Sequence, residues 1–249
     1  MVGKKKIPLY VSATSWVAPA RGGTPAPLSG MPPAPDDADW GALGKALREQ
    51  FGAVQVQLLL SARQCRFLVL PWISSCYSGA SIRAYVADAF AEAMAVTRQT
   101  HHVEIDWPAY GEPILAAAYP RALIESLRAT LRSAGHVLES VDSSIGPILR
   151  RYGRALGAGP VLLAYAEDDG ITGITIEDGR VVQVETLSGD GGGLDDLGVW
   201  SSRKQFSFAD DRQLRWLATT AKPDAFAGVP LAIVGAAPVS AGHAMVIPS

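Results

Sequence analysis

Three short apolar segments between residues 161 and 187 constrain the fold of this chain most strongly. They cover residues 161–165, 171–176 and 181–187, and each has the length and apolar character of a strand. The last two flank Glu177-Asp178-Gly179-Arg180, whose central Asp-Gly pair is favoured in a two-residue hairpin turn. The sequence therefore predicts a β-hairpin at this point, within a sheet that contains consecutive strands.

Helical and extended patterns alternate in the part of the chain before this hairpin. Helices are predicted where apolar residues recur at helical spacing, and strands where apolar runs or period-two alternation occur. The first helix has Asp39 as its expected N-cap, and Gly52 follows where a C-cap would lie. The predicted helices cover residues 40–51, 81–94, 123–131 and 145–152, and the predicted strands cover residues 7–11, 15–17, 54–60, 65–70, 102–107, 113–119 and 137–141. This alternation is typical of an α/β protein.

A glycine-rich segment at residues 153–160 is the best candidate for a domain boundary. Beyond the hairpin, residues 188–193 predict a flexible loop, residues 210–220 predict a helix, and residues 231–234 predict a short buried strand. The order strand, hairpin, helix, strand of the first 70 residues thus recurs in the last 90 residues.

Composition excludes several classes of protein. The chain has 249 residues, of which 48% are apolar, so it can bury a sizeable core. Its 22 Lys and Arg residues against 24 Asp and Glu residues give a formal net charge of -2, which argues against nucleic acid or an anionic membrane as a partner. Cys65 and Cys76 are too few for a disulfide framework. No signal peptide is predicted, and prolines and glycines interrupt the apolar residues 228–249, so we expect no membrane span there.

Three segments contain residue types that bind phosphate or metal ions, and each has a simpler explanation. Residues 189–193 are glycine-rich like a phosphate-binding loop, but no Gly-Lys-Ser/Thr follows them. The acidic residues 167–170 could hold a divalent cation, but a solvated turn between strands explains them as well. His102, Glu104 and Asp106 share one face of a predicted strand, as polar residues on a half-buried strand do. No motif of a catalytic nucleophile occurs, and Cys65 is predicted to be a buried apolar residue.

The order of the elements and several short segments resemble one protein family. Residues 56–61 and 66–72 are similar to the strands by which its first core ends in Leu-Pro, and residues 116–142 are similar to the strand, helix, Ala-Gly turn and returning strand of its small inserted subdomain. Residues 160–180 are similar to the opening hairpins of its second core. This family contains the actin-like proteins of type IV pilus and type II secretion machines, namely the pilus assembly protein PilM and the cytoplasmic domain of GspL.

The resemblance implies an α/β fold with two ribonuclease-H-like, actin-like cores. The first core would comprise residues 1–152, with a small α+β subdomain inserted at about residues 72–142, and the second, shortened core would comprise residues 153–249. The chain is shorter than a full pilus-type member, which implies that the subdomain over the nucleotide in the second half is truncated.

The resemblance also implies that Asp169, Gly170 and Gly235 are remnants of a nucleotide site. An active family member carries an Asp-x-Gly signature at the end of the second core's first strand, where this chain has Ala164-Tyr165-Ala166. The first hairpin, at residues 12–16, has no acidic residue to hold magnesium. Loss of a metal-binding carboxylate would remove the electrostatic stabilisation that phosphoryl transfer requires. We therefore expect no catalytic residue and no metal site, and we do not expect ATP or magnesium as a cofactor.

The function implied by the resemblance is that of a non-catalytic scaffold. Such a protein would lie in the cytoplasm at the inner membrane and bind the cytoplasmic tail of a bitopic inner-membrane protein, at the inserted subdomain or the groove beside it, for example by edge-strand addition. Two alternatives stay open at this point. One is an actin-like or sugar-kinase-like ATPase that binds Mg-ATP with Asp168 and Asp169 as its acidic groups. The other is an adaptor of the same fold outside pili and secretion systems.

Overall fold

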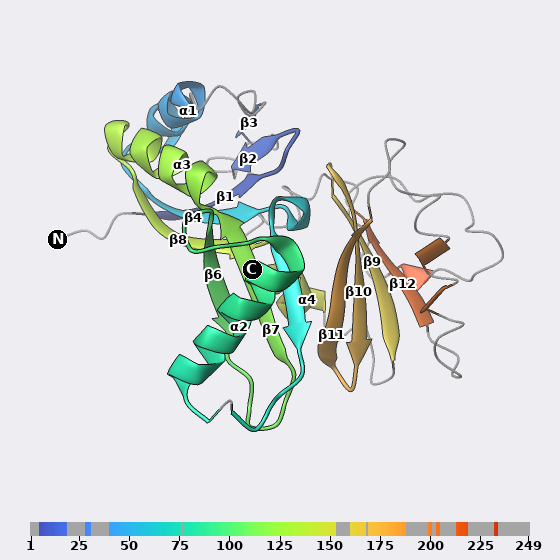
Figure 1. The fold of residues 1–249 in the computed structure, drawn as a ribbon. Helices are drawn as coiled ribbons and strands as arrows, with labels where there is room; N and C mark the ends of the chain where they lie inside the picture. Colours follow the sequence, from blue (N-terminus) through green and yellow to red (C-terminus); the bar gives the residue numbers. More distant parts are fainter. Residues whose placement is uncertain are drawn as a thin grey trace.

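The described part of the chain forms three β-sheets with helices packed on them (Figure 1). The computed structural model describes residues 5–18, 28–30, 40–75, 77–152, 160–167, 169–187, 199–200, 203–204, 213–218 and 232–233. The predicted α/β class is confirmed.

The first sheet has the strand order β3-β2-β1-β4-β8. Its strands are β1 (Lys6–Val11), β2 (Trp16–Ala18), β3 (Leu28–Gly30), β4 (Gln55–Leu60) and β8 (Val137–Ser143). β1 pairs antiparallel with β2, while β1, β4 and β8 run parallel to one another. Helices α1 (Gly41–Phe51) and α3 (Arg121–Ser133) lie side by side over this sheet (Figure 1), because each has an apolar stripe at helical spacing that is buried against it.

The three-stranded sheet is formed by residues that come between β4 and β8 in the chain. Its order is β5-β7-β6, with β5 (Arg66–Leu70), β6 (His101–Asp106) and β7 (Ile114–Pro120) all antiparallel to their neighbours. Helix α2 (Gly79–Met94) begins at a capping box between Ser78 and Ser81. It covers one face of this sheet, where its buried side chains join a separate small core that includes Ile82, Val86, Phe90, Ile114 and Ala116.

The strand pairing differs from the limits of about 72–142 expected for the inserted subdomain. β5 pairs with β7 in the three-stranded sheet and not with β4, although an apolar run at 65–70 directly after another predicted a neighbouring core strand. β8 pairs with β4 in the first sheet, and α3 packs on that sheet with α1. Apolar periodicity identifies a strand but does not choose its neighbour, because the partner is set by tertiary packing.

The second sheet has the order β11-β10-β9-β12-β13. Its strands are β9 (Val161–Glu167), β10 (Gly170–Glu177), β11 (Arg180–Leu187), β12 (Gln213–Ala218) and β13 (Ala232–Ile233). The predicted hairpin is confirmed, since β10 pairs antiparallel with β11 across Asp178 and Gly179. Both of these residues have positive φ angles, 50° and 75°, as a two-residue hairpin turn of this type requires.

One of the predictions for single elements is wrong. The helix expected at residues 210–220 is strand β12, which pairs in parallel with β9. The apolar residues Leu214, Trp216 and Leu217 fit both periodicities over so short a segment, and the buried strand β9 provides an edge that β12 pairs with. Helix α1 is preceded by Trp40 without a side-chain cap, and the expected N-cap Asp39 lies outside the described residues.

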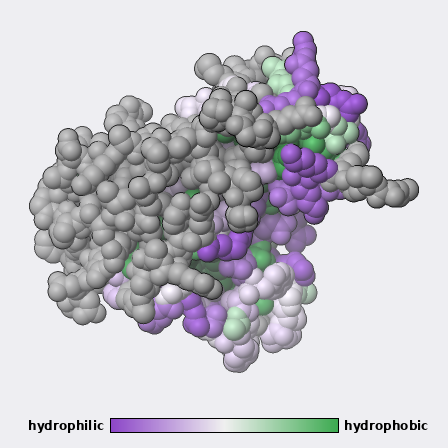
Figure 2. All heavy atoms as spheres, turned by 180° about the vertical axis from the view of Figure 1, so that it is seen from behind, coloured by the Kyte–Doolittle hydropathy of each residue, from purple (hydrophilic) through white to green (hydrophobic). Residues whose placement is uncertain are grey.

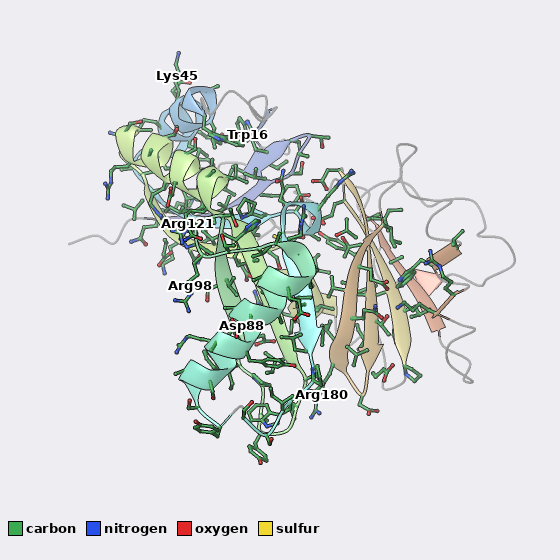
Figure 3. All side chains as sticks on the ribbon, viewed as in Figure 1. Trp16, Lys45, Asp88, Arg98, Arg121 and Arg180 are labelled. Carbon is green, nitrogen blue, oxygen red and sulfur yellow. The ribbon has the colours of Figure 1, made fainter. Side chains whose placement is uncertain are left out.

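The second sheet packs against both other sheets. One continuous cluster of buried side chains contains residues of β1 and β4 together with Val161, Leu163 and Tyr165 of β9. Strand β11 lies next to β5, and Arg180, labelled in Figure 3 at the end of the β10–β11 hairpin, forms an ion pair of 2.5 Å with Glu112 in the β6–β7 connection. The position of the second sheet is therefore fixed by an apolar core and by polar contacts at its rim.

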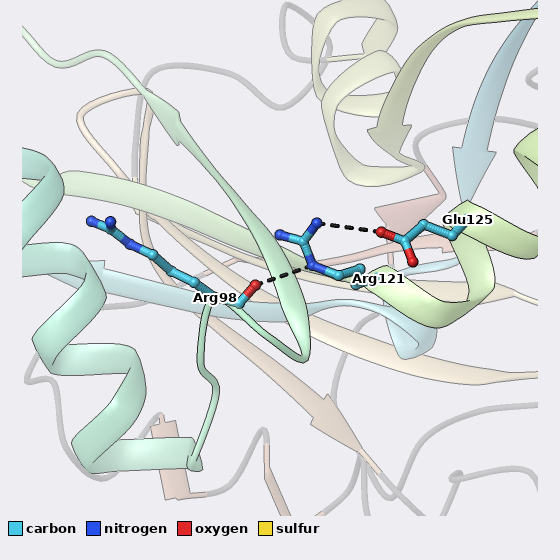
Figure 4. Close-up of polar contacts among 3 residues, drawn as sticks. All are labelled: Arg98, Arg121 and Glu125. Carbon is cyan, nitrogen blue, oxygen red and sulfur yellow. Dashed lines mark hydrogen bonds and ion pairs between the residues drawn. The ribbon is translucent and has the colours of Figure 1, made fainter.

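Arg121 joins the three-stranded sheet to helix α3. Its Nε atom donates a 3.0 Å hydrogen bond to the carbonyl oxygen of Arg98, and its guanidinium group lies 3.4 Å from Glu125 one turn along the helix (Figure 4).

On the back of the molecule, the described surface is mainly hydrophilic with small apolar patches (Figure 2). In the part of the chain that the structure describes, no helix has the length and apolar character needed to cross a membrane.

The close contact between α1 and α3 gives a first prediction. A Cβ atom on the buried Gly44 would lie 3.1 Å from the Cβ of Ala134 and 3.2 Å from the Cγ2 of Thr130. We expect Gly44→Val to lower the free energy of unfolding by about 1–3 kcal/mol, as other overpacked cores do. Urea unfolding measures this change, and the matched variant Ala42→Val, at an exposed position of α1, should cost less than about 1 kcal/mol. Equal losses in the two variants would contradict this account of the helix contact.

Candidate functional site

The chain segments that follow β1 and β4 face the turn between β9 and β10. β1 and β4 are parallel and in register, with Val11 opposite Leu60, so both strands end at the same edge of the first sheet. This edge, the carboxyl end of parallel strands, is where open α/β sheets bind their ligands. We call the contact between this edge and the β9–β10 turn the junction.

The β1–β2 turn is organised by the side chain of Ser12. Its Oγ atom accepts hydrogen bonds from the backbone N–H groups of Thr14 and Ser15 at 3.2 and 2.9 Å. The N–H group of Ala13 points out of the turn and donates to the Oδ2 atom of Asp169 at 3.0 Å. A short polar turn thus presents a backbone donor to a carboxylate of the second sheet.

Asp169 is held by three residues of the segments that follow β1 and β4. Besides Ala13, the hydroxyl of Ser61 donates to the same Oδ2 atom at 2.6 Å, and the guanidinium group of Arg63 donates to the backbone carbonyl of Asp169. The residue is only 7% exposed. Gly170 follows it, and a Cβ atom there would lie 3.3 Å from the side chain of Arg63.

Glu167, at the end of β9, is the second carboxylate of the junction. Its Oε1 atom accepts a hydrogen bond from the hydroxyl of Tyr10 at 3.0 Å, and its Oε2 atom accepts one from the N–H group of Ala62 at 2.8 Å. Burial, followed by the charge of Asp169, raises the pKa of Glu167 to about 8, although the hydrogen bonds from Ala62 and Tyr10 act in the opposite direction.

In the hydrogen bonds just described between these segments, the donors belong to residues 10–63 and the acceptors to residues 167–169. Backbone N–H groups, hydroxyls and an arginine gathered at one sheet edge form an environment that favours an anion. Here the acceptors are the chain's own carboxyl groups, those of Glu167 and Asp169. A phosphate group that entered the junction would have to displace them.

The structure brings together two of the three residues predicted as nucleotide-site remnants. Asp169 and Gly170 lie at the junction, whereas Gly235 and the alternative acidic group Asp168 lie outside the described residues. The interpretation of residues 167–170 as a solvated turn is wrong, because Glu167 and Asp169 are each only 7% exposed. Sequence reasoning named Glu167 only within the acidic segment 167–170 and not as a nucleotide-site residue, and its apolar context in β9 was a local sign that it is buried.

Cys65 lies close to the junction and is fully buried, as predicted. Burial, and after it the charge of Glu167, raise the pKa of its thiol well above the usual value. A thiol of this kind is protonated and unreactive. Cys76 lies outside the described residues. Over the described ranges, no group of three or more His, Cys, Asp or Glu side chains is placed to hold a metal ion.

A groove lies on the face of the three-stranded sheet opposite α2. It has a volume of about 330 Å³ and is lined by that sheet, by the end of β8, by helix α4 (Ile145–Tyr152) and by Val184 of β11. Leu115 and Ala117 of β7 are half-buried on its floor, and Tyr119 of the same strand is buried there. The groove therefore has an apolar floor formed by alternate residues of one strand.

The rim of the groove is acidic. Glu104 and Asp106 are exposed and lie beside the floor, because β6 pairs them with Ala117 and Leu115 of β7. Asp142 of β8 lines the groove as well and lies 3.4 Å from Arg150 of α4. The carboxylates of the rim outnumber this arginine three to one among the charged residues that line the groove.

Comparison with solved structures identifies the fold. The cytoplasmic domain of EpsL, an inner-membrane component of the type II secretion system of Vibrio cholerae, matches 93% of this chain over 86% of its own length, with a TM-score of 0.57 and 12% identity. A Bacteroides thetaiotaomicron protein with an actin-like ATPase fold and unknown function matches 88% of the chain over 83% of its own length, with a TM-score of 0.56 and 10% identity. This chain has an actin-like ATPase fold.

A third structure extends the comparison. A chain of the PilM–PilN type IV pilus biogenesis complex matches 83% of this chain over 66% of its own length, with a TM-score of 0.50 and 15% identity. The resemblance to PilM and to the GspL cytoplasmic domain, stated from the sequence, is thus confirmed for the fold. No protein-family model matches the chain, and a search of curated proteins gave no match.

The hydrogen bonds of Glu167 give a second prediction. Tyr10→Phe removes the hydroxyl that donates to the buried Oε1 atom and should lower the free energy of unfolding by about 1–3 kcal/mol. The control is Tyr85→Phe, at a partly buried position of α2, which should cost less than about 1 kcal/mol. Denaturant unfolding at neutral pH compares the two variants. A loss in Tyr10→Phe no larger than in Tyr85→Phe would contradict the role given to this hydroxyl.

Proposed function

We propose that this protein is a non-catalytic scaffold of a type IV pilus or type II secretion assembly platform at the inner membrane, and that it binds the cytoplasmic tail of a bitopic membrane protein. The observation that carries the proposal is the groove with its apolar floor and acidic rim. The fold it shares with the EpsL cytoplasmic domain and with the PilM–PilN complex supports this assignment.

The proposal includes a division of the chain into two cores. The first sheet with its helices is the first core, residues 1–152, and the three-stranded sheet with α2 is the subdomain inserted in it. The second sheet belongs to the second, shortened core, residues 153–249. On this division the junction joins the two cores, and the groove lies chiefly between the first core and its insertion.

The chemistry of the groove matches a membrane-protein tail. Cytoplasmic segments beside membrane spans carry an excess of Lys and Arg, and Glu104, Asp106 and Asp142 provide the complementary charge. Strand β6 is an edge strand of the three-stranded sheet, so an extended tail can pair with it. Alternate side chains of such a tail would then lie on the same face of the sheet as Leu115 and Ala117.

The junction supports a scaffold more than an ATPase. Phosphoryl transfer depends on donors and a metal ion that stabilise the phosphate oxygens. The N–H groups of Ala13 and Ala62 at this edge are bound instead to Asp169 and Glu167. The alternative of an actin-like or sugar-kinase-like enzyme that binds Mg-ATP keeps one supporting observation, which is that Asp169 lies at this sheet edge.

A groove-filling variant tests tail binding. Gly146 lines the groove, and the nearest atoms to a Cβ atom there would be the side-chain ends of Asp142 and Arg150 at 3.4 Å. We expect Gly146→Leu to fold normally and to weaken binding of the tail by about tenfold or more, which corresponds to about 1.4 kcal/mol. Fluorescence anisotropy with synthetic tails of small bitopic proteins encoded beside this chain measures the affinity.

The control is Gly79→Leu, which makes the same change in α2, where a Cβ atom would contact only Arg83 and Trp107 at 3.6 Å. This variant should bind the tail like the wild type. Equal affinities of wild type and Gly146→Leu would exclude the groove as the docking site, and no binding of any such tail by the wild type would exclude the proposed partner.

A nucleotide titration separates the scaffold from the ATPase. We expect millimolar ATP or ADP with magnesium to leave the melting temperature unchanged, because a ligand raises it only by binding the folded state. Thermal-shift and calorimetric titrations of the wild type and of Asp169→Ala make this measurement. A magnesium-dependent increase in the wild type that is lost in Asp169→Ala would favour the ATPase.

A further inference from the structure

The two carboxyl groups of the junction do more than occupy the hydrogen-bond donors at this sheet edge. We propose that Glu167 and Asp169 form a proton-dependent clamp that holds the second sheet against the first. The clamp is built from hydrogen bonds that all run in one direction, from donors of residues 10–63 to acceptors of residues 167–169. Around these hydrogen bonds, the described core between the two sheets is formed by apolar side chains.

The geometry places two buried carboxyl groups in one site. They are separated by one residue in the chain, each is 7% exposed, and they bind adjacent donors, Ser61 for Asp169 and Ala62 for Glu167. Two negative charges in so small a buried site repel each other, so binding of one proton relieves the repulsion. The donors remain satisfied in the singly charged state, because a protonated carboxyl group keeps acceptor capacity.

The other titratable and charged groups around Glu167 do not take over the role of this proton in neutralising the carboxylate. Tyr10 of β1 and Tyr165 of β9 present hydroxyl groups. Burial raises the pKa of the Tyr165 hydroxyl above its usual value, so this group stays neutral. Cys65 carries a buried thiol whose pKa is raised, so it is neutral. Arg63 donates to the backbone carbonyl of Asp169, and Ser144 at the start of α4 contributes only a hydroxyl.

The sign of the pH dependence follows from the raised pKa of Glu167, which is about 8 in the folded chain against an ordinary value of 4.5. Between these two values the folded state binds a proton that the unfolded chain has released. The proton on Glu167 therefore contributes its full stabilisation of the folded state below pH 4.5. This contribution decreases as the pH rises and is lost once the pH exceeds about 8. Its titration range includes the neutral pH of a bacterial cytoplasm.

The clamp also sets one wall of the groove. Val184 lines the groove from β11, which pairs with β10 directly after the junction. Weakening of the clamp would allow this wall to move away from β5 and α4. This link to the groove rests on the proposed function, whereas the clamp itself does not.

Urea unfolding between pH 6 and 8 tests the clamp without any partner. Relative to Glu167→Gln, which cannot titrate, the equilibrium constant for unfolding of the wild type should increase by about tenfold per pH unit. The matched control Glu49→Gln removes an exposed carboxylate of α1 that pairs with Lys45, and it should follow the wild-type pH dependence. Identical pH dependence of wild type and Glu167→Gln would overturn the proposal.

Two further measurements keep the test decisive if Glu167→Gln does not fold. Asp169→Asn removes the repulsion between the carboxylates, so the pH range over which stability falls should move to lower pH. In the wild type, the amide resonance of Ala62, whose N–H group donates to Glu167, should titrate near pH 8. An Ala62 resonance that does not change between pH 6 and 9, or an Asp169→Asn profile that coincides with the wild type, would contradict the clamp.

Discussion

The structure depends on the placement of two buried carboxylates against the backbone donors of another sheet. Ala13 and Ala62 supply N–H groups at the edge where β1 and β4 end. Asp169 and Glu167, at the turn between β9 and β10, accept hydrogen bonds from these groups. Buried donors without acceptors would cost free energy, as would buried carboxylates without donors. Each sheet therefore completes the polar contacts of the other, and the apolar core of β1, β4 and β9 is closed around them.

This arrangement explains how an actin-like fold can serve as a binding scaffold. The sheet edge that suits phosphate is filled by side chains of the chain itself, while the groove between the three-stranded sheet and α4 offers an apolar floor and an acidic rim. The two features lie on connected elements, because β10 and β11 extend from the junction to Val184 at the groove. A scaffold needs such a stable frame and one recognition surface, and the proposed role requires no chemistry at this sheet edge.

Local signals in the sequence predicted the elements better than their partners. The Asp178-Gly179 pair fixed the β10–β11 hairpin, because its positive φ angles are a local property. Strand β12 was mistaken for a helix, and β8 was placed in the inserted subdomain although it pairs with β4 in the first sheet, because strand pairing is decided by distant segments. The site was the hardest part. Asp169 was selected only through a family resemblance, and its donors Ala13 and Ser61 lie 156 and 108 positions away in the chain. No local pattern marks Glu167 as their neighbour.

One spectrum tests the central claim that the N–H groups of the junction are bound to the chain's own carboxyl groups while the groove is free to bind a tail. Amide resonances of the chain labelled with ¹⁵N-alanine report on Ala13 and Ala62 at the junction and on Ala117 in the groove. The account predicts that saturating Mg-ATP leaves all three resonances unchanged and that a cytoplasmic tail peptide shifts Ala117. Resonances of Ala13 and Ala62 that move with Mg-ATP, while Ala117 ignores every tail, would contradict it.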